Sequence, residues 1–367
     1  MVGREASAPD EARREHIVNP EARPVRWGII GTGNIAHAFA RGLAAAPGAA
    51  AAAVASRNRE RGSAFAAELS IPRVYDSLEK LAADPDIDVV YVATPHALHP
   101  AAAELCLDAG KHVLCEKPLA PTAELARRVV SRARERGLFL MEAMWSFTFP
   151  AMAKALQLLS EGAIGRARVV SAQLGFSAAR EPGSRLFAPD LGGGALLDVG
   201  VYGIALALRI AGGRPDEVQA SSRIGDHAVD ETTLATLSWT DGVRASVLCS
   251  IEAQLSGSAW IGGTAGAIEI PAKFSQPDRI ILRRQGRDPE EFAFARIGNG
   301  YSFEAIEVMR CLASGLTESG CVPLDRSLEA LEVCDAIRAK IGLSYPFEAR
   351  GSAAARRDAN EEPSWNT

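Results

Sequence analysis

The stretch from Val25 to Ser56 decides the fold and reads V-R-W-G-I-I-G-T-G-N-I-A-H-A-F-A-R-G-L-A-A-A-P-G-A-A-A-A-A-V-A-S. An apolar run ends at Gly31, as a buried parallel strand does, and an alanine-rich amphipathic segment follows it directly. Pro47-Gly48 ends that segment, and a second apolar run covers residues 49–55. This order predicts the β-α-β unit that binds dinucleotides, with alanine in the third small position.

The small residues of this turn have separate expected roles. Gly31 permits the tight turn, Gly33 lets the backbone approach a pyrophosphate, and Ala36 lets helix and strand pack closely. The pyrophosphate is expected at the helix N-terminus, where free N–H groups and the helix dipole favour anions. Asn34 and Ile35, which open the helix, are therefore predicted to bind the cofactor as well.

The residues after the second strand bear on the choice of cofactor. A site that prefers NAD places Asp or Glu about 20 residues after the glycines, where it bonds the ribose 2′-hydroxyl. Ser56 and Arg57 stand there instead, and a hydroxyl with a guanidinium suits a 2′-phosphate. With Arg61 close by, the sequence predicts NADP rather than NAD. The alternative is that Arg59 and Arg61 only form the exposed, charged start of a helix.

Length and composition set the outer limits. A chain of 367 residues suffices for two domains, and 47% apolar residues support large cores. A net charge of −5 gives no basic footprint for nucleic acid. No continuous apolar run reaches the roughly 18 residues of a membrane span, so no membrane contact is expected. Six scattered cysteines without a C-x-x-C pair predict free buried thiols and a cytoplasmic protein.

Both ends of the chain are predicted to be disordered tails. Residues 1–23 are charged and contain proline, without the apolar core of a secretory signal, and residues 350–367 are again rich in charge. Between them, a dinucleotide-binding domain is expected over residues 24–146 and a second domain over residues 147–349.

Two more apolar strands of the first domain end in polar loops. Residues 88–93 lead into Thr94-Pro95-His96-Ala97-Leu98-His99, and residues 111–115 lead into Glu116-Lys117-Pro118. In this architecture ligands bind at the carboxyl ends of parallel strands. Cofactor-binding residues are therefore expected in both loops, namely Thr94, Pro95, His99, Glu116 and Lys117.

For Lys117 a simpler interpretation has to be weighed, and the two histidines raise the question of a metal site. Lys117 alone could be a surface lysine in a turn, but Pro118 restricts it to an extended conformation after a buried strand, so the ammonium is held in place. His96 and His99 have no third ligand nearby in the sequence, so no metal site is predicted.

Beyond residue 150 the pattern changes to longer, alternating strands. They are expected over residues 168–175, 217–223, 232–239, 243–251, 259–262, 267–270, 279–283 and 291–297. This pattern predicts an α+β domain with an open, mostly antiparallel sheet after the α/β domain. One layer of helices cannot cover so many strands on both faces, so a homo-oligomer, most simply a dimer, is predicted.

Three glycines of the second domain lead into an apolar helix, G-G-G-A-L-L-D-V-G-V-Y over residues 192–202. Asp198 and Tyr202 are four positions apart and share one face of that helix. Buried polar groups must be hydrogen-bonded, so a carboxylate and a phenol on an apolar helix require an explanation. One explanation is chemistry at this face. The other is a core tyrosine beside an aspartate that caps a loop.

G-T-G-N-I-A, the A-T-P…H loop, E-K-P and the glycine-led helix occur in this chain together. In that combination the chain, over about residues 26–346, resembles the glucose–fructose oxidoreductase, inositol dehydrogenase and rhizopine catabolism (Gfo/Idh/MocA) family. Residues 142–145 and 298–304 are most similar to the dimeric dihydrodiol dehydrogenase branch, which includes NADP-linked D-xylose dehydrogenases.

The resemblance implies a Rossmann domain, a sheet domain and an active site between them. It implies an NADP-dependent oxidoreductase that interconverts a secondary alcohol of a sugar, polyol or cyclic diol with its carbonyl. Lys117 would lie near the nicotinamide, Tyr202 would transfer the proton and Asp198 would orient the site. Trp145 and Phe176 would form aromatic walls of the substrate site.

One residue departs from the family's pattern. Phe147 replaces the arginine that relatives carry after E-A-M-W-[ST], so the substrate is left open. Lys117 and Tyr202 both stay candidates for the proton transfer. Free tyrosine has a pKa of about 10, and the Lys117 cation is expected to lower it. The alternatives are a non-catalytic NADP-binding regulator, or an oxidoreductase that acts on an unsaturated bond or a semialdehyde.

Overall fold

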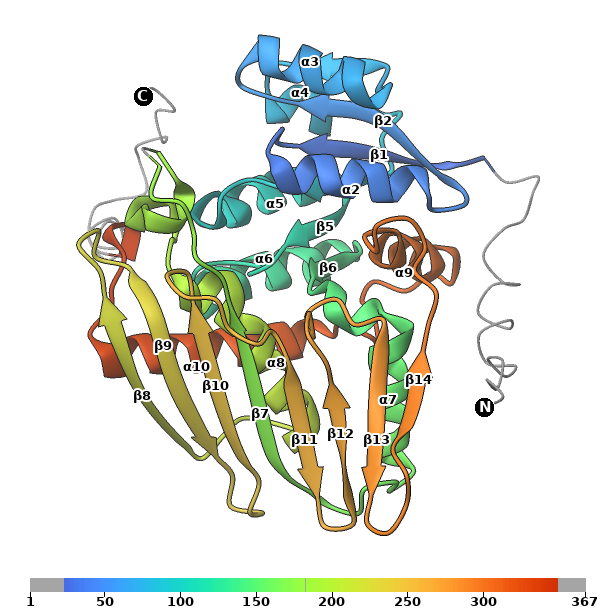
Figure 1. Cartoon of the computed structure of the whole chain (residues 1–367). Helices are drawn as coiled ribbons and strands as arrows, with labels where there is room; N and C mark the ends of the chain where they lie inside the picture. Colours follow the sequence, from blue (N-terminus) through green and yellow to red (C-terminus); the bar gives the residue numbers. More distant parts are fainter. Residues whose placement is uncertain (1–22, 182, 349–367) are drawn as a thin grey trace.

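The computed structural model of the protein describes residues 23–181 and 183–348. The predicted disordered tails lie outside these residues, apart from Arg23. Two sheets form the framework, one of six strands and one of eight, and helices pack between and beside them (Figure 1).

The six-stranded sheet is parallel throughout, with the order β3-β2-β1-β4-β5-β6. Its strands are β1 (Val25–Ile30), β2 (Ala49–Ala55), β3 (Arg73–Tyr75), β4 (Val89–Val92), β5 (His112–Glu116) and β6 (Leu140–Ala143). The helices of this half are α2 (Asn34–Ala44), α3 (Arg59–Leu69), α4 (Leu78–Ala82), α5 (His99–Asp108) and α6 (Ala123–Arg136). This arrangement confirms the predicted Rossmann domain.

The glycine-rich turn joins β1 to α2 at the centre of this sheet. Gly31 has φ +108°, and a Cβ atom there would lie 2.6 Å from the Ala93 carbonyl oxygen at the end of β4. Only glycine fits this position, because both the backbone angle and the neighbouring chain exclude a side chain. Gly33 is different, since its backbone is extended and open space surrounds the position of a Cβ atom.

The eight-stranded sheet has the order β14-β13-β12-β11-β7-β10-β9-β8. Its strands are β7 (Ala167–Gly175), β8 (Glu217–Ile224), β9 (Asp230–Ser238), β10 (Arg244–Ser250), β11 (Ala259–Gly263), β12 (Gly266–Ile270), β13 (Arg279–Arg284) and β14 (Glu290–Ala293). Neighbouring strands are antiparallel, except that β7 and β10 are parallel. The predicted open, mostly antiparallel sheet is confirmed, although β14 ends at Ala293 rather than at the predicted residue 297.

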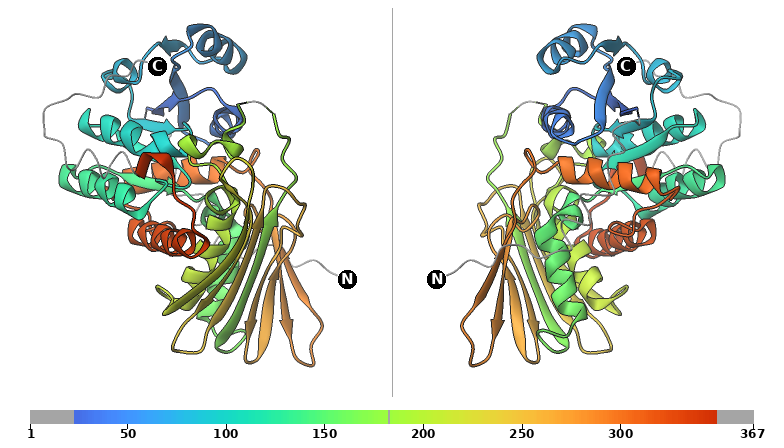
Figure 2. Two further views of the ribbon diagram at one scale, coloured as in Figure 1. Left: turned by 90° about the vertical axis from the view of Figure 1, so that its left-hand side faces the viewer. Right: turned by 90° about the vertical axis from the view of Figure 1, so that its right-hand side faces the viewer.

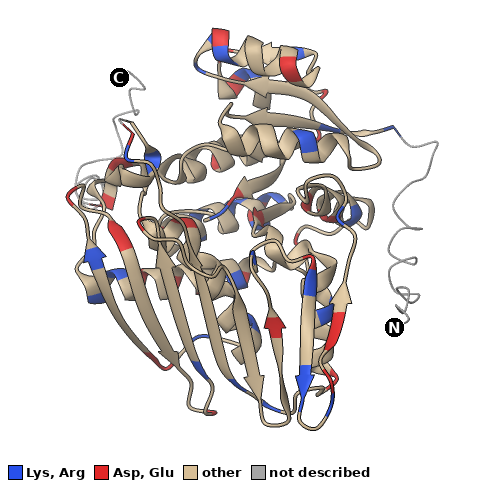
Figure 3. Cartoon of the chain, viewed as in Figure 1, with Lys and Arg blue, Asp and Glu red and all other residues tan. Residues whose placement is uncertain are grey.

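Helices cover one face of this sheet. The helices of this half are α7 (Pro150–Ser160), α8 (Val201–Ala211), α9 (Ser302–Ala313) and α10 (Leu324–Ile341). Figure 2 shows α7, α8 and α10 on one side of the sheet, and within the described residues no helix covers the other side. Val169, Leu234 and Trp260 stand exposed on that other face. Charged residues occur mainly on the outer strands and at the strand ends of this sheet (Figure 3).

The segment that includes α8 is the most apolar part of the chain. The segment over residues 189–211 is long and apolar enough to cross a membrane by length and composition. However, 89% of an apolar 18-residue stretch within it is buried inside the protein. The segment therefore matches a core helix that packs against the sheet. The six cysteines, which all lie within the described residues, form no disulfide there, and five of them are buried, as the sequence predicted.

The C-terminal helices return to the first domain. α9 packs against α2, and α10 lies against both α6 and α8. The Asp335 carboxylate on α10 accepts a hydrogen bond of 2.9 Å from the Ala123 N–H at the start of α6. Residues beyond the expected boundary at 146 thus help to fix the carboxyl edge of the parallel sheet against the second sheet.

We expect Gly31→Ala to lower the free energy of unfolding by about 1–3 kcal/mol, because the methyl group would need a strained backbone and would press on the Ala93 oxygen. Gly33→Ala is the matched control, since its backbone and surroundings accept a methyl group, and should change stability by less than about 0.5 kcal/mol. Urea unfolding without cofactor measures both. Equal losses in the two variants would contradict the assigned role of Gly31.

Candidate active site

The site lies where the carboxyl ends of β1, β4 and β5 meet the beginning of α8. The glycine turn follows β1, the loop from Thr94 to His99 follows β4, and Lys117 follows β5 directly. On the opposite side, the glycines at 192–194 lead into a short π-helix, η5 (Leu196–Gly200), which continues as α8. The predicted single helix is thus irregular, and π-helical turns of this kind are frequent at functional sites.

The three predicted catalytic residues come together across this boundary. The Lys117 Nζ atom donates to the main-chain oxygen of Asp198 at 2.5 Å and lies 3.4 Å from its Oδ1 atom. The same ammonium lies 5.2 Å from the centre of the Tyr202 ring, as a cation–π contact. Lys117 comes from the first domain and the other two residues from the second, so the fold itself assembles the group.

Asp198 carries a negative charge at the centre of a group of cations. Its Oδ1 atom also accepts from Arg185 Nη2 at 2.9 Å. Burial alone would raise the pKa of Asp198, but Lys117 and Arg185 outweigh burial and hold that pKa well below its ordinary value. Asp198 is therefore ionised at neutral pH, and its carboxylate contacts both Lys117 and Arg185.

Arg185 is a site residue that the sequence did not predict. It belongs to a short helical turn, η3 (Arg185–Phe187), just before the glycines, and 45% of its side chain is exposed. Its Nη1 atom lies 3.3 Å from His96 Nε2. No local pattern marked Arg185, because its contacts join segments far apart in the chain. Its partly exposed guanidinium gives the site a second cation that a ligand can reach.

His96 and His99 are buried and serve the loops around the site. Burial, with the nearby Arg185 and Lys117 charges, holds the pKa of His96 well below its usual value. The neutral His96 ring can donate from Nδ1 to the Gly192 oxygen, 2.9 Å away, and accept from Arg185 at Nε2. His96 thus connects the main chain at Gly192 with the side chain of Arg185.

The His99 ring links the two loops of the first domain. Burial lowers the pKa of His99 to about 4. Its ring nitrogens lie 2.7 Å from the carbonyl oxygens of Pro118 and Thr94. Within the described residues no three His, Cys, Asp or Glu side chains gather as metal ligands.

Tyr202 corrects one prediction. Burial raises the pKa of the Tyr202 hydroxyl well above its usual value, and the nearby acidic groups, Glu116 among them, act in the same direction. Lys117 faces the ring of Tyr202 and hydrogen-bonds to Asp198, and its charge does not outweigh burial and the acidic groups. The predicted lowering of the Tyr202 pKa is therefore not found. Tyr202 carries its proton at neutral pH.

Glu116 lies behind Lys117 and fixes its backbone. Its Oε2 atom accepts from the Lys117 N–H at 3.1 Å, and its Oε1 atom accepts from the Tyr91 hydroxyl. Burial raises the pKa of Glu116. Glu304 on α9 is fully buried nearby, and within the described residues neither of its carboxyl oxygens has a hydrogen-bond partner. These acidic groups contribute to the environment in which Tyr202 stays protonated.

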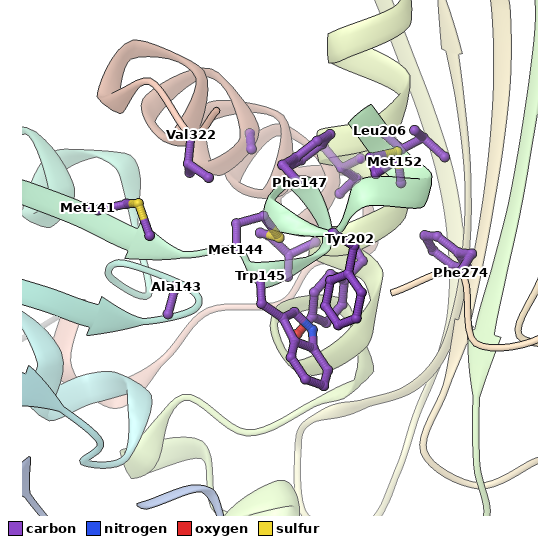
Figure 4. Packing of buried hydrophobic residues seen from close by; sticks show 14 of the residues in the cluster. Met141, Ala143, Met144, Trp145, Phe147, Met152, Tyr202, Leu206, Phe274 and Val322 are labelled. Carbon is purple, nitrogen blue, oxygen red and sulfur yellow. The ribbon is translucent and has the colours of Figure 1, made fainter. Parts of the chain in front are cut away.

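Aromatic side chains border the site. Trp145 stacks on Tyr301 with ring centres 4.3 Å apart, and Trp145 and Tyr202 belong to one apolar cluster (Figure 4). Phe147 points toward a small cavity between α8 and α10, and its ring lies 5.8 Å from the Arg209 guanidinium. Its departure from the family's arginine thus concerns packing beside that cavity. Phe176 packs in a different apolar cluster, next to the π-helical turn.

The N-terminus of α2 offers the features that a dinucleotide needs. Within the described residues, no side chain caps this helix and its first turn has no acidic residue. Gly33 and Asn34 are exposed there, while Ile35 and Pro95 are half-buried. Free N–H groups at an open helix start suit a pyrophosphate.

A second set of residues lies where the rest of a dinucleotide would reach. The Thr94 Oγ1 atom is buried and has no hydrogen-bond partner within the described residues. Ser56 is buried at the end of β2, and Arg57 and Arg61 are exposed. Neither arginine forms an ion pair in the part of the chain that the structure describes. These residues fit a bound dinucleotide.

Comparisons with known proteins agree with this geometry. The family model described as an oxidoreductase family with an NAD-binding Rossmann fold matches residues 25–144, and the GFO/IDH/MocA C-terminal domain matches residues 152–269. The trans-1,2-dihydrobenzene-1,2-diol dehydrogenase of Mus musculus is 38% identical over 337 residues, covering 89% of this chain and 99% of that protein. The enzyme of the same name from Homo sapiens is 36% identical over 335 residues, covering 89% and 99%.

Solved structures give the same result. KijD10, a 3-ketoreductase from Actinomadura kijaniata crystallised with NADP and TDP-benzene, is 30% identical with a TM-score of 0.79, covering 87% of this chain and 98% of that one. An aldose-aldose oxidoreductase from Caulobacter crescentus, complexed with glycerol, is 26% identical with a TM-score of 0.79, covering 87% and 97%.

Proposed function

The chain belongs to the Gfo/Idh/MocA family of oxidoreductases, and from that premise we propose that it interconverts a secondary alcohol of a sugar, polyol or cyclic diol with its carbonyl, using NADP. The observation that carries the proposal is the joint position of Lys117, Asp198 and Tyr202 at the carboxyl edge of the parallel sheet. A cation and a protonated phenol thus lie where a substrate oxygen would meet the cofactor.

The residues of this chain supply binding, orientation and proton transfer. The α2 N-terminus and the glycine turn would hold the pyrophosphate, and Thr94 would meet the rest of the dinucleotide. The nicotinamide, when bound, supplies or accepts the hydride. The Lys117 ammonium would stabilise negative charge on the substrate oxygen, and the Tyr202 hydroxyl would transfer the proton.

The protonation state of Tyr202 favours one direction. In carbonyl reduction the substrate oxygen gains negative charge and accepts the Tyr202 proton, so a hydroxyl with a raised pKa is already in the required form. Alcohol oxidation needs a proton acceptor instead, and Tyr202 would have to lose its proton first. We infer that the protonated Tyr202 hydroxyl suits carbonyl reduction.

The surroundings support a polar, ring-sized substrate. Trp145 and Tyr301 offer flat aromatic surfaces, and Arg185 adds hydrogen-bond donors within reach of solvent. Sugars and cyclic diols present such a combination of apolar and hydroxyl-bearing faces. The named activities of the dihydrodiol dehydrogenases and of the aldose-aldose oxidoreductase lie in the same chemical class.

The choice of NADP rests on the end of β2. Ser56, Arg57 and Arg61 lie there, and no acidic residue stands where one would repel a 2′-phosphate. The NADP named in the KijD10 structure supports the same choice. A cytoplasmic location is part of the proposal, since NADP-linked reduction and cysteines that form no disulfide within the described residues both suit a reducing compartment.

A homodimer completes the proposal. The uncovered face of the eight-stranded sheet exposes Val169, Leu234 and Trp260 on neighbouring or nearby strands. Large apolar side chains gathered on a flat sheet face suit a self-complementary contact between two copies of the chain.

Catalysis is tested with Tyr202→Phe and Lys117→Met on a panel of sugars, cyclic diols and their ketones, with NADPH oxidation followed for the ketones and NADP reduction followed for the alcohols. Each change should lower turnover by about 10²–10⁴, and NADPH affinity should change little with Tyr202→Phe. The double variant should lose much less than the product of the two factors, because the groups act together. Tyr75→Phe, which removes a hydroxyl that binds Asp84 and none of the proposed catalytic residues, is the control. Normal turnover by Tyr202→Phe would remove Tyr202 from the mechanism.

Cofactor choice is tested with Ser56→Asp. The new carboxylate would face the 2′-phosphate, and like charges 4 Å apart repel by about 1–4 kcal/mol, so NADPH should bind roughly tenfold or more weakly while NADH binds nearly as before. Dissociation constants from fluorescence titration measure both cofactors, with Ser160→Asp on the exposed end of α7 as the control. Equal affinity of the unmodified protein for NADPH and NADH would contradict the choice of NADP.

The dimer is tested by light scattering. The unmodified protein should have the mass of two chains at micromolar concentration, and Leu234→Glu with Trp260→Glu should give the mass of one, because the charges would be buried at the contact. Leu316→Glu, at an exposed leucine outside the sheet, should leave the mass unchanged. A single-chain mass for the unmodified, active protein would rule the dimer out.

A further inference from the structure

A buried carboxylate anchors the beginning of the helix that carries the catalytic residues. Asp230, the first residue of β9, is completely buried. Its Oδ2 atom accepts hydrogen bonds from the Leu196 N–H at 2.7 Å and from the Thr233 hydroxyl at 2.8 Å. Leu196 is the first residue of the π-helical turn. A carboxylate at this point also meets the positive end of the helix dipole.

The glycines before this turn make room for the carboxylate. Gly194 has φ +112°, and a Cβ atom there would lie 2.1 Å from Asp230 Oδ1. The Tyr345 hydroxyl holds the preceding residue by donating to the Gly193 oxygen at 2.8 Å. Within the described residues Asp230 Oδ1 has no hydrogen-bond partner. The glycine at 194 is thus required for the carboxylate to reach Leu196.

Keeping Asp230 ionised in the folded protein is energetically unfavourable. Burial raises the pKa of Asp230 to about 7, and only Arg338 among its charged neighbours opposes burial. Arg338 is already paired with Asp335 and Glu348. The other titratable groups that face Asp230 are Cys249 on β10, Cys334 on α10 and the Tyr345 hydroxyl. A neutral side chain would fit this environment better, so stability alone does not explain an aspartate here.

The anchor is directly connected to the catalytic group. Leu196 precedes Asp198 by two residues in the same short turn, and the main-chain oxygen of Asp198 accepts the 2.5 Å hydrogen bond from Lys117. Tyr202 follows in the first turn of α8. Small displacements of such groups are costly, since about 1 Å of misplacement can slow a reaction by roughly 10²-fold.

We propose that Asp230 is a positioning residue of the active site: by accepting the Leu196 N–H, its carboxylate fixes Asp198 and Tyr202 against Lys117. The proposal rests on the proposed oxidoreductase function. It concerns a residue that touches neither substrate nor cofactor and acts through the helix alone.

The proposal has a pH dependence with opposite signs for activity and stability. A carboxylate accepts a hydrogen bond more strongly than its protonated form, so turnover should fall as the pH decreases through about 7. Stability should move the other way. The folded protein holds the Asp230 proton more tightly than the unfolded chain does, so the contribution of Asp230 to stability decreases as the pH rises from about 4 to about 7.

Asp230→Asn tests the proposal, because an amide keeps the shape but cannot carry the charge. At pH 8 we expect kcat to fall by about 10- to 100-fold, with KM and the NADPH dissociation constant changed less than about threefold. The decline of turnover through pH 7 should be absent. The Tm at pH 8 should be equal to or higher than that of the unmodified protein, and hydrogen exchange of the peptide over residues 195–202 should be faster.

Glu231→Gln is the matched control. Glu231 is the next residue, is equally buried and pairs with Arg180 and Arg223, so the same chemical change is made without touching the helix. It should leave turnover and its pH profile unchanged.

Two results would overturn the proposal: Asp230→Asn with the turnover and pH profile of the unmodified protein, or with a lowered Tm and unchanged exchange over residues 195–202. An unmodified protein that acts on no compound of the panel would instead count against the proposed function. The exchange measurement needs no substrate, and it still decides whether Asp230 anchors the helix.

Discussion

The contact between Lys117 and Asp198 is the constraint on which the rest of this structure depends. It joins Lys117 of the first domain to a π-helical turn of the second domain, through a hydrogen bond of 2.5 Å to the main-chain oxygen of Asp198. Because the main chain rather than only the carboxylate accepts, the contact specifies where the whole turn lies. The returning helices α9 and α10 keep the two domains in the relation that this contact needs.

The same contact determines the charges of the site. Asp198 neutralises part of the charge of Lys117 and Arg185 and holds both cations beside its own carboxylate. The Tyr202 hydroxyl is left among buried acidic groups, and its pKa rises rather than falls. A cation near a phenol therefore does not by itself make a proton acceptor. The direction in which the cation points, and what it already binds, decide the outcome.

Most of the fold could be predicted from local sequence patterns. The glycine turn after β1, the apolar parallel strands and the alternating strands of the second half each leave a signature within a few residues, because backbone geometry and burial act locally. Lys117, Asp198 and Tyr202 could be selected because each lies at a recognisable motif. Arg185 and Asp230 could not, since their roles come from contacts with His96, Asp198 and Leu196 that only the tertiary structure creates.

Arg185 and Asp230 differ in how their charges affect the stability of the fold. Arg185 keeps 45% of its side chain in solvent, so its charge is partly hydrated and weighs little on stability. Asp230 is completely buried, and its carboxylate accepts hydrogen bonds from the Leu196 N–H and the Thr233 hydroxyl. A core made for stability alone would place an apolar or amide side chain there. Asp230 lies under the first turn of the helix that carries Asp198 and Tyr202, so its cost in stability fits a side chain that fixes this stretch of backbone, where a small displacement would reach both residues.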